Sequence, residues 1–459
     1  MTTWQPDLSG QSGPRYVAIA DILGRDIAAG RLKPGDRLPT HRELAWKLGV
    51  TVGTITRAYA EAERRGLVAG EVGRGTYIRE RPVDTPPPAP EEDGFVDLAR
   101  NMPPGWRDNS EIGEVLAEIG RSADLGTLLG YCPNLGLPAH REAGAQWIAR
   151  SGLTASPAEI AVTNGAQHGM VLAFAALSRA GDTVLTEQLT FYGLKSVASL
   201  LSLRLHGVAI DEHGLVPEAL EAACRQTGAK VLYCIPTLHN PTTALMPAAR
   251  RAMIADVCRR HGVTIVEDDI YSFLSDTAPP TLSSYLPEQS VLVTSLSKCV
   301  SPGLRAGFIR ANGPTIERIG SALRGTTWMA TPIAVEAAAR LIRSGAAERM
   351  AHRMREDAVA RQKTAAELLA DADYAAHPAA FHVWLTLPEP WRREDFTQQV
   401  RRRGVGVAPA DAFAVGRAPV PHAVRIGLSA ARDHAQLRRA LTIITDTLRE
   451  GPESGIPMV

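Results

Sequence analysis

Lysine is rare in this sequence of 459 residues, in which most of the 50 basic residues are arginine and the six lysines stand at positions 33, 47, 195, 230, 298 and 363. Arginine stays protonated in proteins, whereas a desolvated lysine can lose its proton and form a Schiff base. A lysine placed just after an apolar strand is therefore a candidate for covalent chemistry as well as for charge.

Three other absences narrow the class of protein. The five cysteines are odd in number and form no CxxC pair, which favours the reduced cytoplasm over a disulfide framework. No uncharged apolar run approaches the ~20 residues of a membrane span, and residues 1–15 lack the apolar core of a signal peptide. The net charge of +1 gives no overall field that would attract nucleic acid or membrane. We expect a cytoplasmic protein of two or three domains with no membrane segment.

The strongest chemical signal lies in residues 291–310, VLVTSLSKCVSPGLRAGFIR. Three apolar residues predict a buried strand. It is followed by the hydroxyls of Ser295 and Ser297, by Lys298 and, beyond a Pro-Gly turn, by Arg305. Hydroxyls beside a guanidinium are suited to binding a phosphate. For this segment alone, a surface lysine at the end of a strand is the simpler interpretation.

The first eighty residues predict three short helices and a hairpin. Apolar residues recur at helical spacing in 16–30, 44–48 and 55–62, and short β-type runs occupy 67–68 and 76–78. Thr40 and Glu43 fit a capping box, and Thr51 can cap the third helix. This order of elements is that of a winged helix-turn-helix.

Residues 37–78, RLPTHRELAWKLGVTVGTITRAYAEAERRGLVAGEVGRGTYI, resemble the GntR-type winged-helix domain over its full length. The resemblance implies that a double-stranded DNA operator is bound, with contacts from Arg42, Thr51, Thr54, Arg57 and Arg74. Short hydroxyls at a helix amino terminus approach phosphates, and arginines reach guanine edges or the backbone. Where the family usually carries arginine, this chain has Val52, followed by Gly53. For each residue alone, a solvated helix face is the alternative.

Residues 80–94, ERPVDTPPPAPEEDG, are rich in proline and acid and predict an extended spacer. The predicted organisation is therefore a winged-helix domain at 12–79, a linker at 80–94 and a large domain at 95–459.

The large domain alternates β-branched runs with alanine-rich helical patterns, which predicts an α/β fold with a mainly parallel sheet. The runs stand at 160–163, 183–185, 231–233, 263–266 and 291–293. Ligands of such sheets bind at the carboxyl ends of the strands, and polar clusters occur at these ends here. Examples are the helix start after residue 163, suited to a phosphate, and the Glu-Asp-Asp sequence at 267–269.

This series resembles the fold type I pyridoxal 5′-phosphate (PLP) aminotransferases from about residue 95 to the end. SLSKCVSPGLRAG is similar to their Schiff-base segment, with Lys298 as the lysine that bonds the cofactor. The resemblance assigns catalytic roles to Lys298, Asp268 and Tyr271, and the α-carboxylate of a substrate to Arg425. It places Asp268 at the pyridine nitrogen, Tyr271 and Asn240 at the 3′-oxygen, and Phe191 against the ring. It assigns the phosphate to Gly165, Ala166, Gln167, Ser295, Ser297 and Arg305.

The same resemblance implies a homodimer, because Tyr131 matches a tyrosine that reaches the phosphate of the neighbouring subunit. Two departures from the family pattern bear on the substrate pocket. Phe191 and Tyr192 stand where tyrosine and proline are usual, and Thr243 stands where glycine is common. No residue is assigned to a metal.

A GntR-like domain joined to an aminotransferase-like domain resembles the MocR subfamily of transcription regulators. The first hypothesis is a PLP-dependent DNA-binding regulator that senses an amino acid, an amine or the cofactor itself. The alternative is an active PLP-dependent aminotransferase with an appended winged helix. A scaffold without ligand exchange is a third possibility, against which the presence of Lys298, Asp268 and Arg425 argues.

Overall fold

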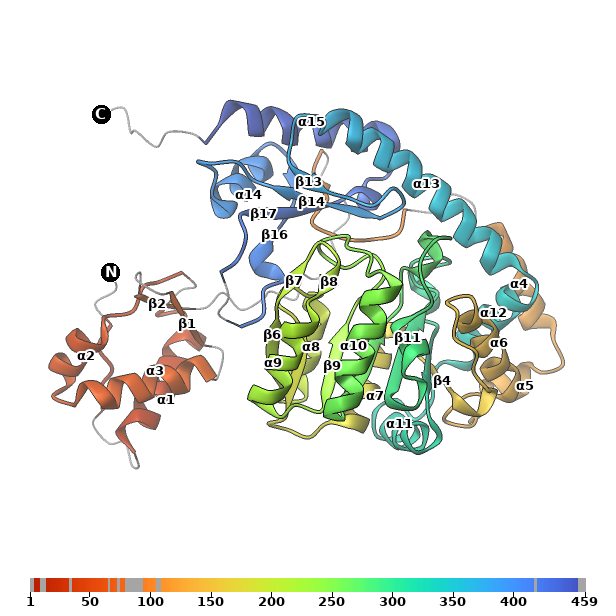
Figure 1. Cartoon of the computed structure of the whole chain (residues 1–459), viewed down its shortest axis with the longest axis horizontal. Helices are drawn as coiled ribbons and strands as arrows, with labels where there is room; N and C mark the ends of the chain where they lie inside the picture. Colours follow the sequence, from red (N-terminus) through yellow and green to blue (C-terminus); the bar gives the residue numbers. More distant parts are fainter. Residues whose placement is uncertain are drawn as a thin grey trace. The chain divides into compact units, whose positions relative to one another are not determined.

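The computed structural model describes residues 4–8, 14–32, 35–64, 67–71, 75–78, 94–104, 109–416 and 419–452. The chain divides into two compact units, Met1–Glu92 and Asp93–Val459 (Figure 1). Arg74 and residues 80–93 of the predicted linker lie outside the described residues.

The smaller unit has the predicted three helices and a hairpin, namely α1 (Arg15–Ala28), α2 (His41–Leu48), α3 (Val52–Arg64), β1 (Val68–Glu71) and β2 (Gly75–Ile78). The capping box is confirmed, since Thr40 Oγ1 accepts from the Glu43 amide and Glu43 Oε2 accepts from the Thr40 amide. Gly49 ends α2 in the left-handed conformation, which a residue without a Cβ adopts easily. Apolar side chains from α1, α2 and α3, such as Ile19, Leu44 and Ile55, form one fully buried core.

The larger unit alternates helices and strands along the chain, as the sequence predicts. Its helices are α4 (Ser110–Arg121), α5 (Leu125–Leu129), α6 (Pro138–Ala149), α7 (Ala166–Leu177), α8 (Tyr192–Leu200), α9 (Pro217–Thr227), α10 (Ala248–His261), α11 (Gly313–Thr326), α12 (Pro332–Arg343), α13 (Ala346–Leu368), α14 (Arg393–Arg402) and α15 (His434–Glu450). The strands of its main sheet are β4 (Ile160–Thr163), β5 (Thr183–Glu187), β6 (Arg204–Val208), β9 (Val231–Cys234), β10 (Thr264–Asp268), β11 (Ser290–Ser295) and β12 (Gly307–Ala311).

The main sheet has the strand order β4-β12-β11-β10-β9-β5-β6. Strands β6, β5, β9, β10 and β11 run parallel, and β12 is antiparallel to both of its neighbours. The prediction of a mainly parallel sheet is therefore confirmed. The carboxyl ends of β5, β9, β10 and β11 lie along one edge, where their polar residues meet.

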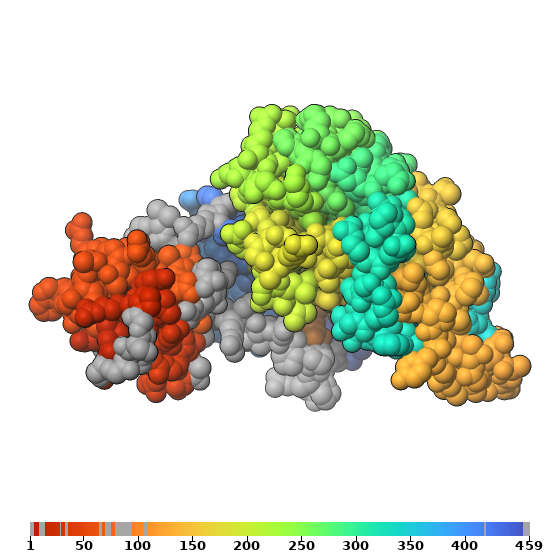
Figure 2. Space-filling model, turned by 90° about the horizontal axis from the view of Figure 1, so that it is seen from below, coloured from red at the N-terminus to blue at the C-terminus, as the bar shows by residue number. Residues whose placement is uncertain are grey.

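Helices cover both faces of this sheet, which explains why its strands are apolar throughout. Alternate strand residues such as Leu232 and Ile265 pack against α9 and α10, while Val231 and Val266 pack against α7, α8 and α11. In the space-filling view, the teal segment that contains α11 lies between the orange segment of α4 to α6 and the yellow segment of α7 and α8 (Figure 2).

A second sheet completes the unit and carries one of the predicted site residues. It has the order β13 (Tyr374–Ala375), β14 (His382–Thr386), β17 (Ala423–Gly427) and β16 (Ala408–Pro409), with α13, α14 and α15 packed on its apolar core. The short pairs β3 (Val96–Asp97) with β15 (Val405–Gly406) and β7 (Ile210–Asp211) with β8 (Gly214–Leu215) lie outside both sheets. The predicted site residue Arg425 lies on β17 of this sheet.

Gly144 in α6 tests how tightly this helix packs on the sheet. A Cβ at this position would lie 2.5 Å from Phe308 Cδ1 and 2.9 Å from Ile160 Cγ2, so we expect Gly144→Ala to lower the free energy of unfolding by about 1–3 kcal/mol. Gly113 in α4 is the matched control, because a Cβ there meets no atom within 4 Å. Gly113→Ala should raise the free energy of unfolding by up to ~1 kcal/mol. Urea unfolding checks both, and equal effects of the two changes would contradict the packing argument.

Candidate functional site

Lys298 lies just beyond the carboxyl end of β11, among charged groups supplied by several elements. Its amine donates to the main-chain oxygen of Asn101. Burial, and secondarily the nearby Arg425 guanidinium, lower the pKa of Lys298 to about 8, while Asp268 opposes this effect. A lysine with such a pKa is neutral in a sizeable fraction of molecules near neutral pH, which a nucleophilic amine requires.

Asp268 ends β10 and has two oxygens in different situations. Its Oδ2 accepts a hydrogen bond of 2.7 Å from the Tyr233 hydroxyl, whereas its Oδ1 is buried and, among the described residues, has no partner. Burial raises the pKa of Asp268 to about 7, and the bond from Tyr233 works against that rise. A fixed carboxyl with one open oxygen is suited to a cationic N–H donor such as a pyridinium.

Asn101, in the segment before α4, joins Lys298 to Tyr271. Its main-chain oxygen accepts from Lys298, and its side-chain Nδ2 lies 2.8 Å from the Tyr271 hydroxyl and 3.1 Å from His382 Nδ1. Burial raises the pKa of Tyr271, so this phenol stays protonated. These contacts bring Tyr271 and Lys298 together in one polar cluster around Asn101.

Arg425 is fully buried, and within the part of the chain that the structure describes no carboxylate forms an ion pair with it. Its Nη1 donates to Asn240 Oδ1 at 2.7 Å and its Nη2 to the Ala99 oxygen at 2.6 Å, and its guanidinium lies 4.8 Å from the centre of the Phe413 ring. Its Nε is buried without a partner from the described residues. A buried cation in this state is suited to an incoming carboxylate.

A cradle for an anion forms where α7 begins. Gly165 has φ of 82°, a conformation that side chains rarely adopt, and a Cβ there would lie 2.7 Å from Arg305 Nη2, so the glycine leaves room for the guanidinium. The amides of Ala166 and Gln167 belong to the first turn of α7, where the helix itself uses no N–H groups. Ser297 Oγ is buried and lacks a partner among the described atoms, whereas Ser295 Oγ accepts from the Ser297 amide at 3.4 Å. The Gln167 side chain donates to the Gly193 oxygen.

Phe191 stands at the start of α8, next to the half-exposed Tyr192. The two rings lie 4.8 Å apart, and the Tyr192 ring lies 6.3 Å from that of Phe413. Three aromatic rings therefore form a continuous series. It begins at Phe191, the residue predicted to stack on a cofactor, and ends at Phe413, whose ring lies against Arg425.

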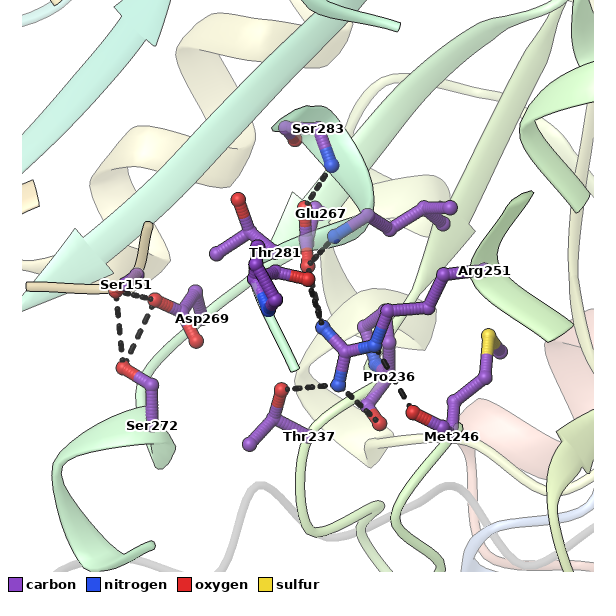
Figure 3. A network of polar contacts seen from close by, with 12 residues as sticks. Ser151, Pro236, Thr237, Met246, Arg251, Glu267, Asp269, Ser272, Thr281 and Ser283 are labelled. Carbon is purple, nitrogen blue, oxygen red and sulfur yellow. Dashed lines mark hydrogen bonds and ion pairs between the residues drawn. The ribbon is translucent and has the colours of Figure 1, made fainter. Parts of the chain in front are cut away.

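The two carboxyls that flank Asp268 are held by other groups (Figure 3). Glu267 accepts from the amides of Leu282 and Ser283 and lies 3.9 Å from the Arg251 guanidinium. Arg251 also donates to four oxygens, those of the Met246, Pro280 and Pro236 carbonyls and the Thr237 hydroxyl. Asp269 accepts from the hydroxyls of Ser151 and Ser272. Arg251 therefore fixes both ends of the segment 236–246, which contains Asn240.

The other predicted residues are Tyr131 of the larger unit and the DNA-binding candidates of the smaller unit. Tyr131 is 87% exposed, with its ring 6.1 Å from that of Trp328. In the smaller unit, Arg42 and Arg57 are exposed on α2 and α3, and Thr51 Oγ1 accepts from the Thr54 amide at the start of α3. The prediction for Arg74 falls outside the described residues.

Three further residues of the site, Asn101, Tyr233 and His382, are not among those predicted from the sequence. Tyr233 is the one of the three with a detectable signal, since a hydroxyl in a buried apolar strand needs a partner. Asn101 and His382 reach the site only because two distant segments fold against each other, and the spacing of residues does not encode this.

The architecture of the larger unit is that of the fold type I aminotransferases. The kynurenine aminotransferase of Pyrococcus horikoshii superposes with a TM-score of 0.73 at 21% identity, over 78% of this chain and 92% of that one. The α-aminoadipate aminotransferase LysN of Thermus thermophilus superposes with a TM-score of 0.71 at 24% identity, over 78% and 93%. These likenesses establish the fold.

Sequence comparison assigns both units to families. Residues 93–444 match the family Aminotransferase class I and II, and residues 15–78 match Bacterial regulatory proteins, gntR family. The HTH-type transcriptional regulator YdeF of Bacillus subtilis is 30% identical over 452 residues, 96% of each chain. The vitamin B6 salvage pathway transcriptional repressor PtsJ of Salmonella typhimurium is 27% identical over 425 residues, 90% of this chain and 94% of that one.

The chain therefore belongs to the class I and II aminotransferase family, in the group of HTH-type transcriptional regulators that carry a gntR family domain ahead of the aminotransferase-like domain. This combination is that of the MocR subfamily, as the sequence predicts. Membership implies pyridoxal 5′-phosphate as the cofactor and DNA binding by the gntR family domain.

Two further findings concern membranes and metals. No helix within the described ranges has the length and apolar character needed to cross a membrane. No group of three or more histidine, cysteine or acidic side chains in those ranges is placed to hold a metal ion.

Arg251 and its sequence neighbour Arg250 offer a test of the network beside Asp268. Arg251→Leu would leave Glu267 buried without a cation, so we expect the free energy of unfolding to fall by about 3–5 kcal/mol. Arg250 pairs with Asp211 near the surface, where the two side chains are 19% and 32% exposed, and Arg250→Leu should cost about 1 kcal/mol or less. Urea unfolding measures both changes. A similar cost for the two variants would show that the buried network does not hold this strand end.

Proposed function

We propose that this protein is a cytoplasmic transcriptional regulator that binds its operator as a homodimer and holds PLP at Lys298. An amino acid, an amine or the cofactor itself acts as effector at that site and changes DNA binding. The observation that carries the proposal is that one chain joins a gntR family domain to a half-buried lysine of lowered pKa, near a buried arginine that forms no ion pair among the described residues.

The residues of the larger unit fit PLP in three respects. The Asp268 Oδ1 suits the pyridine nitrogen, and the close approach of Gly165 and Arg305 suits the phosphate. The Ser297 hydroxyl, like the Asp268 Oδ1, has no partner among the described residues, and it adds a donor. When bound, PLP would supply an aldehyde that reacts with amines and a ring that withdraws electrons.

Each side chain then has a defined task. Lys298 supplies the amine that bonds the cofactor and can afterwards accept a proton. Asp268 holds a proton on the pyridine nitrogen, Tyr271 and Asn240 bind the 3′-oxygen, and Phe191 covers the ring. Arg425 binds the carboxylate of an amino-acid effector, which a bidentate guanidinium recognises well. The phosphate contacts come from Gly165, Ala166, Gln167, Ser295, Ser297 and Arg305.

The exposed Tyr131 supports the homodimer. Tyr131, Leu129 and Trp328 are large apolar side chains, each more than half exposed, and Tyr131 and Trp328 are in ring contact. Exposed apolar side chains gathered in this way are typical of an interface. A second copy that covers them would place Tyr131 at the partner's phosphate site.

The smaller unit supports operator binding through its second and third helices. The exposed Arg42 and Arg57 and the hydroxyls at the start of α3 present donors to a DNA backbone or to base edges. Vitamin B6 salvage is what the name of the Salmonella relative describes, and the genes under control here follow from where the operator lies.

Capture of PLP tests the role of Lys298. We expect a yellow protein, a borohydride-fixed label on Lys298, and a rate of capture that rises with pH until about 8, because roughly a tenth of the lysines are neutral at pH 7 when the pKa is about 8. Lys298→Ala should abolish the label, whereas Lys363→Ala, an exposed change on α13, should leave it intact. Absorbance and peptide mapping measure these outcomes, and a label on other lysines alone would contradict the assignment.

Operator binding tests the role of the smaller unit. With a duplex selected from a random pool, we expect a footprint that changes on adding PLP or an amine. Arg57→Ala should weaken binding by about 1–3 kcal/mol. If Arg57 contacts a phosphate, the slope of the logarithm of the binding constant against the logarithm of the salt concentration should also fall by about one. Arg25→Ala, on α1 outside the α2–α3 pair, should leave affinity unchanged. Equal binding of selected and scrambled duplexes would refute specific recognition.

A further inference from the structure

The amide of Asn101 makes two contacts that fix which way it faces. Its Nδ2 lies 2.8 Å from the Tyr271 hydroxyl and 3.1 Å from His382 Nδ1, while its Oδ1 is buried with no partner among the described residues. An amide nitrogen has two hydrogens and can only donate. In this orientation both hydrogens are used, one toward the phenol and one toward the imidazole.

The imidazole of His382 determines this orientation from its far side. His382 Nε2 lies 3.2 Å from the main-chain oxygen of His239, and a carbonyl oxygen can only accept, so Nε2 carries the hydrogen. Burial lowers the pKa of His382 to about 3, so the ring is neutral and Nδ1 is an acceptor. Nδ1 therefore requires a donor from Asn101, and the opposite amide orientation would set two acceptors against each other.

The orientation of the Asn101 amide leaves the hydroxyl hydrogen of Tyr271 unused. Because its oxygen accepts from Asn101, its own hydrogen is not needed for that contact, and among the described residues no acceptor takes it. The phenol is buried, and burial raises its pKa, so the hydrogen is present. A buried O–H that is left in this state is available to a bound molecule.

We propose that Asn101 and His382 are positioning residues that turn the hydroxyl hydrogen of Tyr271 toward the 3′-oxygen of bound PLP. The inference rests on the proposed cofactor site and adds two residues to it. Each group orients the next by a hydrogen bond: the His239 carbonyl orients His382, His382 orients Asn101, and Asn101 orients the Tyr271 hydroxyl that donates to the cofactor. The segment that supplies His239 also supplies Asn240, so one turn supports two contacts to the same oxygen.

Several charged or titratable groups surround Tyr271 and set the background for any test. Asp268 and Tyr192 raise its pKa and Arg425 lowers it, while Lys298 shares the Asn101 carbonyl. A substitution that adds charge at position 101 would act on all of them. The test therefore has to separate the direction of one hydrogen from a general electrostatic effect.

A double-mutant cycle with the full-length protein loaded with PLP makes this separation. Asn101→Asp places an oxygen where the amide nitrogen was, so that Tyr271 donates to position 101 instead of to the cofactor. Tyr271→Phe removes the hydrogen altogether. The readout is the pH midpoint of the visible absorbance change of the bound cofactor, because donation to its ionised 3′-oxygen favours the deprotonated chromophore. We expect each single variant to raise the midpoint by about one pH unit or more.

In the double variant, Asn101→Asp should add little to Tyr271→Phe, because the hydrogen on which it acts is gone. A shift that is the same in both backgrounds would mean that the carboxylate introduced at position 101 acts through its charge, and would overturn the inference. So would an unchanged midpoint in the single variant. Asn312→Asp, on the N-cap of α11 with its amide on the Glu288 carbonyl, is the matched control and should not move the midpoint.

If Asn101→Asp does not fold, as judged by its thermal midpoint, His382→Phe tests the same series of hydrogen bonds by removing the imidazole that orients Asn101. Without the imidazole acceptor the amide can turn and accept from Tyr271, so the midpoint should again rise, and again only when Tyr271 is present. If this variant takes up PLP and its midpoint is unchanged, the inference about Asn101 and His382 is overturned, while the proposed cofactor site stands. A wild-type protein that takes up no PLP would overturn the proposed cofactor site and this inference with it.

Discussion

Three consecutive carboxyls are buried at the end of β10, and the site depends on how they are accommodated. Glu267, Asp268 and Asp269 are each 2% exposed or less, and burial is the first cause of a raised pKa in all three. Each is held by different neighbours: the first by Arg251 and two amides, the second by Tyr233, the third by two serine hydroxyls. Since successive residues of a strand face opposite ways, Asp268 faces away from the other two. This arrangement gives one carboxyl to the ligand side and uses two to anchor the strand.

The site also has three cationic side chains. Lys298, Arg425 and Arg305 lie close enough for the two guanidinium groups to help lower the pKa of the lysine, and Asp268 is the acid that counters them. Arg425 is fully buried, Lys298 is half-buried and Arg305 is exposed, and an excess of positive charge around a buried cation is costly unless anions approach it. A phosphate at one end and a carboxylate at the other would restore the balance. The residues thus favour a bound molecule that carries two separated negative groups, and the aromatic rings of Phe191, Tyr192 and Phe413 cover the space between them.

How much of this could be predicted from the sequence depends on how local each signal is. The capping box at Thr40, the strand before Lys298 and the glycine that begins α7 are encoded within a few residues, and local physics predicts them. The fold class followed from the alternation of β-branched and alanine-rich runs. The roles of the site residues remain proposals, although Lys298 and Tyr271 both bond to Asn101, and Arg425 bonds to Asn240. Asn101 and His382 are separated by 281 residues and touch only in the folded unit, so no spacing rule identifies them.

Joining a ligand site to a DNA-binding domain imposes a thermodynamic condition that any mechanism here must meet. An effector changes DNA affinity only if it binds the DNA-bound and free states with different affinities. By linkage, DNA must then change the affinity for the effector by the same factor. In the proposed regulator the site favours such a difference, because its contacts join separate segments of the larger unit, Arg425 to Asn240 and Lys298 to Asn101. A ligand that draws these segments together gains all of its contacts in one arrangement and loses several in another. If the proposed effector binds in this way, the polar cluster around Lys298 is the place where its binding energy would favour one state of the protein over the other.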